Sequence, residues 1–107
     1  MNIITNNHQL CERALQNLKN VIDPEIGLNI VDLGLLYQLD FDEDHSALFL
    51  SMTLTTQFCP MGSSIREGAI QALQQAFPGY QVQVNLVFDP PWNSKKISEE
   101  GQKFLNA

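Results

Sequence analysis

The sequence has few cysteines and no apolar run long enough to cross a membrane. Only Cys11 and Cys59 occur among the 107 residues, and they do not form a CxxC pair. Their spacing therefore indicates neither a disulfide framework nor a self-contained zinc site. No apolar stretch approaches the roughly 18 residues that span a bilayer, and the first residues lack the pattern of a signal peptide. We expect a cytoplasmic protein with no membrane partner, whose metal chemistry would need ligands from another molecule.

Positive charge is also scarce. Six lysines and arginines stand against twelve acidic residues, which gives a formal net charge of −6. The basic residues are scattered along the chain and form no stripe that could follow a phosphate backbone, so nucleic acid is not an expected partner. The 44% hydrophobic content is that of an ordinary globular protein, and the length suits one domain over residues 1–107.

The first half of the chain predicts one helix and a hairpin. Cys11, Leu15, Leu18 and Ile22 recur at helical spacing, with Asn6 or Asn7 as the cap, and Asp23-Pro24 should end this helix. Residues 25–34 are expected to form an ordered loop. Alternating residues in 35–41 and 48–54 predict two strands joined by a turn at 42–45, with the even-numbered side of the second strand facing the core.

The second half predicts a helix, a strand and a short terminal helix. Ile65, Ala69, Leu73 and Ala76 form a helical stripe that Phe77-Pro78-Gly79 stops. Residues 82–88 alternate as a strand, and residues 97–105 suit a helix capped by Ser98. Strands with one apolar face need helices packed on that face. The fold class is therefore α+β, a two-layer α/β domain with the order α-β-β-α-β plus a short C-terminal helix.

Cys59 is the best candidate for a reactive cysteine. It lies between the second strand and the following helix, and Pro60 suits the first position of a helix. Free N–H groups and the positive dipole end at a helix start favour the thiolate, which both attacks electrophiles and binds metals. Ser64 and Glu67 also fit a capping box, which would start the helix later and leave Cys59 in a loop. A buried small hydrophobe is the alternative for Cys59, whereas Cys11 fits its helical stripe as a core residue.

Two other pairs of polar residues could take part in chemistry. Thr55 and Thr56 follow the second strand, where their hydroxyls could donate hydrogen bonds to a thiolate or a bound sulfide. Asp23 and Glu25 flank Pro24, where their carboxylates could bind iron, accept protons, or only cap and solvate a turn. Threonine is also simply favoured in strands, so this pair is weak evidence by itself.

Three further residues have ordinary explanations. His8 precedes the first helix and His45 lies in the hairpin turn, so both are expected to be solvated polar residues and neither is an obvious base for Cys59. Trp92 could be an exposed contact residue or could fold onto the core.

Four motifs in order resemble the SufT/PaaD family of metal–sulfur cluster biosynthesis proteins. The resemblance covers the chain from about Val21 onward and is carried by Asp23-Pro24-Glu25-Ile26-Gly27, Asn29-Ile30-Val31-Asp32-Leu33-Gly34-Leu35, Thr53-Leu54-Thr55-Thr56 with Cys59-Pro60, and Asp89-Pro90-Pro91-Trp92. The chain lacks the further C-terminal cysteines of the PaaD branch, so it is more similar to the SufT-like branch.

The resemblance implies an accessory factor, and not an enzyme, that acts in iron–sulfur cluster assembly or insertion. It implies that Cys59 is the ligand of iron or of the cluster, with Asp23, Glu25, Thr55 and Thr56 gathered around it. Clusters commonly need four thiolates, so a single cysteine can provide only transient coordination and the isolated chain should hold no stable cofactor. The implied partners are scaffold or carrier proteins and apo-client enzymes, and a homodimer would bring two Cys59 thiols together.

Two other functions fit the same residues. Cys59 could be the nucleophile of a thiol enzyme, with Asp23 or Glu25 assisting proton transfer. The chain could instead be a metal-free adaptor that recruits apo-proteins through the Trp92 loop or a sheet edge.

Overall fold

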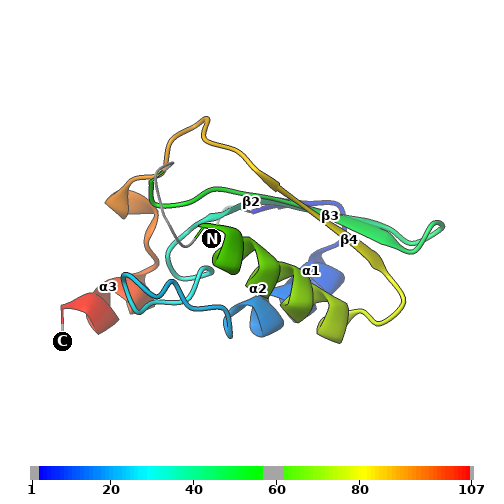
Figure 1. Cartoon of the computed structure of the whole chain (residues 1–107), viewed down its shortest axis with the longest axis horizontal. Helices are drawn as coiled ribbons and strands as arrows, with labels where there is room; N and C mark the ends of the chain where they lie inside the picture. The colour runs from blue at the N-terminus through cyan, green and yellow to red at the C-terminus, as the bar shows by residue number, and fades with distance from the viewer. Residues whose placement is uncertain (1–2, 57–61, 107) are drawn as a thin grey trace.

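The computed structural model describes residues 3–56 and 62–106 and contains helices and strands in one layered unit (Figure 1). The elements, in chain order, are β1 (Ile4–Thr5), α1 (His8–Leu18), β2 (Leu36–Asp42), β3 (Ala47–Met52), α2 (Gly62–Ala76), β4 (Gln81–Leu86), the short 3₁₀ helix η1 (Ser94–Lys96) and α3 (Glu99–Leu105).

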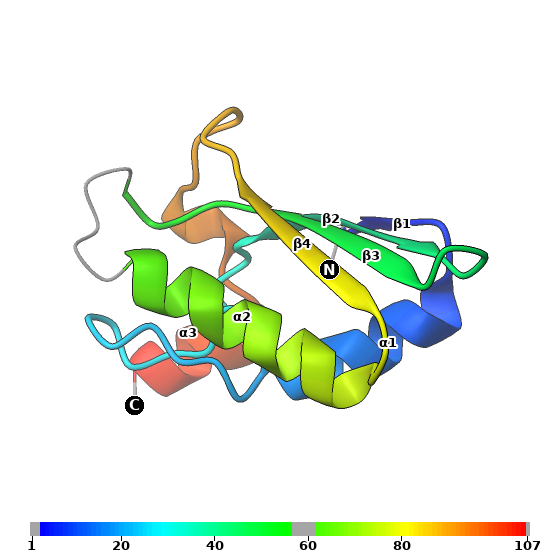
Figure 2. The same cartoon turned by 45° about the vertical axis from the view of Figure 1, so that its right-hand side comes forward.

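The four strands form one mixed sheet in the order β1-β2-β3-β4. β2 and β3 pair as an antiparallel hairpin, while β1 lies parallel to β2 and β4 parallel to β3. Each parallel pair requires a crossover connection, which α1 supplies between β1 and β2 and α2 supplies between β3 and β4. Figures 1 and 2 show α1 and α2 side by side beneath one face of the sheet. The predicted α+β class and the order of the predicted elements are confirmed.

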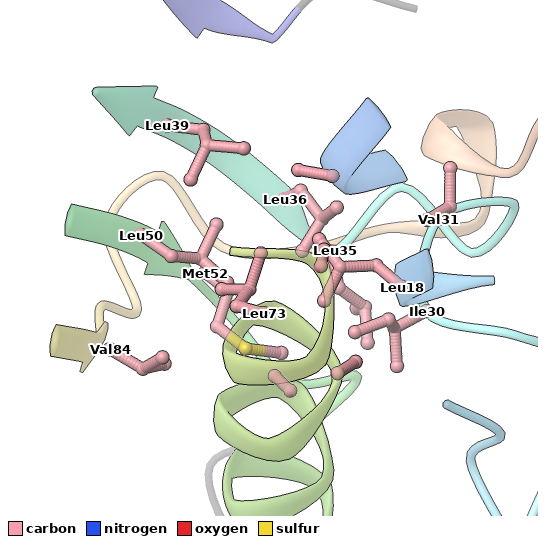
Figure 3. Packing of buried hydrophobic residues seen from close by; sticks show 14 of the residues in the cluster. Leu18, Ile30, Val31, Leu35, Leu36, Leu39, Leu50, Met52, Leu73 and Val84 are labelled. Carbon is pink, nitrogen blue, oxygen red and sulfur yellow. The ribbon is translucent and has the colours of Figure 1, made fainter. Parts of the chain in front are cut away.

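The buried side chains follow the predicted alternation. Leu48, Leu50 and Met52 of β3 are fully buried, and Phe49 between them is exposed. Figure 3 shows Met52 beside Leu73 of α2, where the strand and the helix meet. Cys11 of α1 belongs to the same hydrophobic cluster, as the sequence predicts. The layers are therefore held together by apolar burial, which stabilises by about 25 cal/mol for each Å² removed from water.

Two of the predicted helix caps are confirmed. The Asn7 side chain accepts a hydrogen bond from the backbone N–H of Leu10 at 3.0 Å. The Ser98 hydroxyl accepts one from Gly101 at 3.0 Å. Each cap satisfies a backbone donor of the first helical turn, which has no partner inside the helix.

The predicted end of the first helix is wrong. α1 ends at Leu18 and does not continue to Asp23, and Ile22 is 48% exposed. The cause is a competing backbone pairing, in which Ile30 N–H donates to the Val21 carbonyl and Asp23 N–H to the Leu28 carbonyl. α2 already includes Gly62, which excludes the alternative of a later start at the capping box of Ser64. The strands predicted over 48–54 and 82–88 end earlier, at Met52 and Leu86.

The sequence did not predict β1, because two residues are too few to show alternation. Just after β1, the side-chain amide of Asn6 pairs with the backbone of β2 as a peptide group of a neighbouring strand would. Its Nδ2 donates to the Phe41 carbonyl, and its Oδ1 accepts from the Phe41 N–H, each at 2.9 Å. This border of the sheet is therefore closed partly by a side chain.

The opposite border of the sheet is β4. The backbone N–H groups of Gln81 and Val87 donate to the carbonyls of Ser46 and Met52, on the β3 side. Because this direction alternates along a strand, the even-numbered residues between them point their N–H and C=O groups away from β3. Arg66 of α2 reaches around this border, and its Nε donates to the Val84 carbonyl at 3.1 Å.

Among the helices of residues 3–56 and 62–106, none combines the length and the apolar character that a membrane-spanning helix requires.

The segment after β4 folds back along the molecule and is fastened at several points. Tyr37 donates its hydroxyl proton to the Pro90 carbonyl at 2.7 Å. Ser98 Oγ donates to an Asp32 carboxylate oxygen at 2.8 Å, and the Ser98 N–H donates to the Asp32 carbonyl at 2.7 Å. Gly34 has φ +75° and lies directly against the Lys96 carbonyl, where a Cβ atom would overlap it. The segment is thus fixed to the loop before β2.

The close approach at Gly34 predicts an unequal effect of two alanine substitutions. Gly79 also has a positive φ, +89°, but has open space where a side chain would lie. Gly79→Ala should therefore cost only the backbone strain, about 1–2 kcal/mol. Gly34→Ala should lower the free energy of unfolding by clearly more, because the same strain is joined by the overlap with Lys96. Chemical denaturation of both variants measures the difference, and equal losses would show that the contact is unimportant.

Candidate functional site

The polar residues after β3 lie where the sheet meets the start of α2. Thr53 is buried, and its backbone N–H donates to the Leu35 carbonyl at 2.8 Å. Leu54 packs so closely on Gly62 that a Cβ atom added there would lie 2.7 Å from its Cδ1. Leu54, just after β3, and Gly62, the first described residue of α2, are therefore in close contact.

Thr55 and Thr56 line a shallow cleft of about 260 Å³ together with the segment after β4. The other lining residues are Thr53, Leu54, Phe88, Pro91 and Trp92. Trp92 is half-buried, and its Nε1 donates to the Leu33 carbonyl at 2.7 Å, so it folds onto the molecule and forms one wall. The cleft thus combines threonine side chains with an aromatic wall. The sequence placed Phe88 in the predicted strand 82–88, but β4 ends at Leu86 and Phe88 lines this cleft instead.

Asp23 is 1% exposed and is part of a tight turn. Its Oδ1 accepts a hydrogen bond from the Glu25 N–H at 2.9 Å, and its carbonyl accepts one from Gly27 at 2.7 Å. The carboxylate therefore caps the turn, one of the roles that the sequence left open. Glu25 is exposed.

The turn at Asp23 lies toward the same end of the molecule as the N-terminal end of α2 (Figure 2). Val21, just before it, packs on Gly68 of α2, with Cγ1 3.1 Å from where a Cβ atom would be. Neither Asp23 nor Glu25 lines the cleft of Thr55 and Thr56. The structure thus brings the two threonines together with Trp92. That all four polar residues gather around Cys59 stays a prediction.

Of the two cysteines, Cys59 lies outside the described residues, so its predicted role is not tested. Cys11 is 5% exposed in α1. Burial raises the pKa of the Cys11 thiol, a side-chain hydrogen bond with Thr5 opposes this, and the Glu12 carboxylate adds to it. Cys11 is therefore mostly protonated at neutral pH and is a poor nucleophile or ligand.

Both histidines lie at the opposite end of the sheet from Thr55. His45 is in the turn that precedes β3, and its exposed ring contacts the Asp42 carboxylate at 2.9 Å. His8 begins α1 two residues after Asn6, whose amide is bonded to Phe41 near the end of β2. β3 runs from the hairpin turn toward Thr55, so neither ring lies on the threonine side.

Within the ranges 3–56 and 62–106, no three histidine, cysteine or acidic side chains group together as a metal site would require. Several residues of the recognised motifs have a structural task instead. Asn29 and Asp32 bond to each other, with Asn29 Nδ2 2.7 Å from Asp32 Oδ2, and Asp32 also binds Ser98. The spacing of Asn29 and Asp32, three residues apart, is the sequence signal that could have predicted this hydrogen-bonded turn.

Comparison with known protein families gives a match over residues 12–86 to the model described as "Iron-sulfur cluster assembly protein". Two curated bacterial proteins are similar over most of their length. One is the Fe-S protein maturation auxiliary factor YitW of Bacillus subtilis, 38% identical over 83% of this chain and 86% of its own. The other is the Fe-S protein maturation auxiliary factor SufT of Staphylococcus aureus, 40% identical over 73% of this chain and 88% of its own.

The fold also has a solved counterpart. The crystal structure of a domain of unknown function, DUF59, from Bacillus anthracis superposes with a TM-score of 0.85. That domain is 33% identical in sequence, and the match covers 92% of each chain.

The turn at Asp23 predicts that an acceptor oxygen, and not the negative charge, is needed for folding. Asp23→Asn keeps an oxygen for the Glu25 N–H and should melt close to the native protein. Asp23→Ala removes it and should cost about 1 kcal/mol. Thermal unfolding compares the two, with Glu25→Ala as an exposed control. Equal losses in both Asp23 variants would contradict the capping role.

The raised pKa of Cys11 predicts slow alkylation in the native protein. Less of a thiol is ionised at neutral pH when its folded pKa is raised, so modification should speed up as the pH rises toward that value. Iodoacetamide followed by peptide mass spectrometry should find Cys11 unmodified until the protein is denatured. Rapid native labelling of Cys11 would show that burial does not protect it.

Proposed function

Because the chain belongs to the iron–sulfur cluster assembly protein family, we propose that it is an accessory factor in the maturation of iron–sulfur proteins. In this role the Cys59 thiolate is a transient ligand of iron or of the cluster, which is cargo and not a resident cofactor. The main support is the similarity to two maturation auxiliary factors along most of the chain.

The chemistry of the two cysteines also supports Cys59 as the ligand. Thiolates are the usual ligands of iron–sulfur clusters. Cys11 is withdrawn into the core with a raised pKa, so among the two cysteines of the chain Cys59 is the better candidate. Cys59 follows Thr55 and Thr56 in sequence, and their hydroxyls could donate to a thiolate or a sulfide. Asp23 and Glu25 complete the proposed site as nearby carboxylates.

The single proposed thiolate ligand favours transfer of the iron or the cluster to another protein over its storage on this chain. One thiolate cannot fill the cysteine positions of a cluster, which commonly number four. The remaining ligands would come from a scaffold or carrier protein, an apo-client, a second copy of this chain or a small thiol. Coordination shared in this way is easily exchanged, because each partner holds only part of the cargo. This is the property that a factor acting between a scaffold and a client requires.

The proposal predicts that Cys59→Ala impairs transfer without harming the fold. In an anaerobic assay, an apo-client enzyme is activated from a cluster-loaded scaffold in the presence of the native chain or a variant. Cys59→Ala should slow activation about tenfold or more, which corresponds to about 1.4 kcal/mol of lost stabilisation. Its melting temperature should stay near the native value. Iron and sulfide bound to the chain are quantified in parallel with the absorption spectrum.

Cys11→Ala is the matched control, because it removes the other thiol while keeping a small apolar side chain. It should support activation at the native rate. If Cys59→Ala also supports the native rate, the thiolate mechanism is wrong. The metal-free adaptor would then be favoured, and Trp92→Ala should abolish client binding.

A further inference from the structure

A second and larger cleft lies between the start of β2 and the fastened C-terminal segment. Its volume is about 480 Å³, within the range of small-molecule sites, and it shares no lining residue with the cleft of Thr55 and Thr56. The wall from β2 contains Tyr37, and the wall from η1 contains Lys95 and Lys96, followed by Ser98 and Glu99. Two of the six basic residues of the chain therefore meet in one cavity.

The ammonium group of Lys96 is held by an aromatic ring and not by a carboxylate. Its Nζ lies 4.4 Å from the centroid of the Tyr37 ring and donates to the Tyr37 hydroxyl oxygen at 3.2 Å. A lysine has three N–H donors, so two remain for another acceptor. Within the described residues, no acidic side chain forms an ion pair with Lys95 or Lys96. Glu99 also lines the cleft, so its lining has two lysines and one acidic residue in a chain whose net charge is −6.

The cleft is built independently of any ligand. The Lys96 carbonyl rests against Gly34, and Ser98 is bonded to Asp32. The Tyr37 hydroxyl donates its proton to the Pro90 carbonyl, which turns an oxygen lone pair toward Lys96. A ligand would therefore not have to order the side chain of Lys96, and this lowers the entropic cost of binding.

We propose that this cleft binds the oxyanion of a small molecule, a phosphate or a carboxylate group, through Lys95 and Lys96. Ammonium groups act as compact point charges and bind such oxygens by charge-assisted hydrogen bonds. The volume leaves room for more of the molecule than the anionic group alone. This inference does not depend on the proposed role of Cys59.

The test is a titration of the isotopically labelled full chain followed by amide chemical shifts. Pyrophosphate and citrate are added separately at low ionic strength. Saturable shifts are expected at Gly34, Tyr37 and Ser98, and they should weaken as salt is added. The tighter of the two probes identifies the anionic group as phosphate or carboxylate.

Variants separate this site from general attraction to positive charge. Lys96→Met and Lys95→Gln should each weaken binding about tenfold. Lys95→Gln is needed because Lys96→Met also removes the contact between Lys96 and Tyr37, whereas the Lys95 side chain makes no hydrogen bond or ion pair with the described residues. Lys103→Gln is the matched control, since Lys103 lies in the same segment but does not line the cleft. The proposal is overturned if shifts do not saturate, or if the control weakens binding as much as Lys95→Gln.

Discussion

The Asp32 residue joins two parts of the chain that are 66 positions apart in sequence. Its carboxylate binds Asn29 within its own loop and the Ser98 hydroxyl at the start of α3, and its carbonyl binds the Ser98 N–H. The same Ser98 hydroxyl caps α3, so one network sets both the loop and the last helix. Hydrogen bonds to a charged group contribute about 1.5–3 kcal/mol, more than those between neutral groups. The course of the C-terminal segment therefore depends on this carboxylate.

That segment lines both the cleft of Thr55 and Thr56 and the cleft of Lys95 and Lys96. Trp92 forms a wall beside Thr55 and Thr56, and its indole is fixed by the Leu33 carbonyl. A few residues later, Lys96 stands over Tyr37 in the second cleft. The motif residues before β2 thus serve as supports for the segment that carries Trp92 and Lys96. Motif residues of this kind can matter to a family without touching its cargo.

The fold could be predicted where a periodic pattern and the packing it implies agree. Alternation in β3 identified the buried Leu48 and Leu50, and local capping chemistry identified Asn7 and Ser98. Prediction failed where distant pairing decides the outcome. Ile22 continues the helical stripe, but the backbone there pairs with residues 28–30 instead.

The candidate site could be predicted only in part, for a related physical reason. Residue type suggested that Asp23 could bind iron or cap a turn, but only the fold shows that its carboxylate is buried and bonded to Glu25 N–H. Likewise, Trp92 could have been exposed, and only the fold places it against Leu33 and beside the threonines. The role of Cys59 rests on family and chemistry and stays a prediction.

Asn6 and Arg66 have a consequence for the behaviour of the protein in a crowded cell. Strands at the margin of a sheet offer unpaired peptide groups on which another chain can polymerise. Here an amide occupies part of one margin and a guanidinium part of the other. Another chain that pairs with the sheet at Phe41 or Val84 would first have to displace these side chains, so both margins are less open to such pairing at these positions.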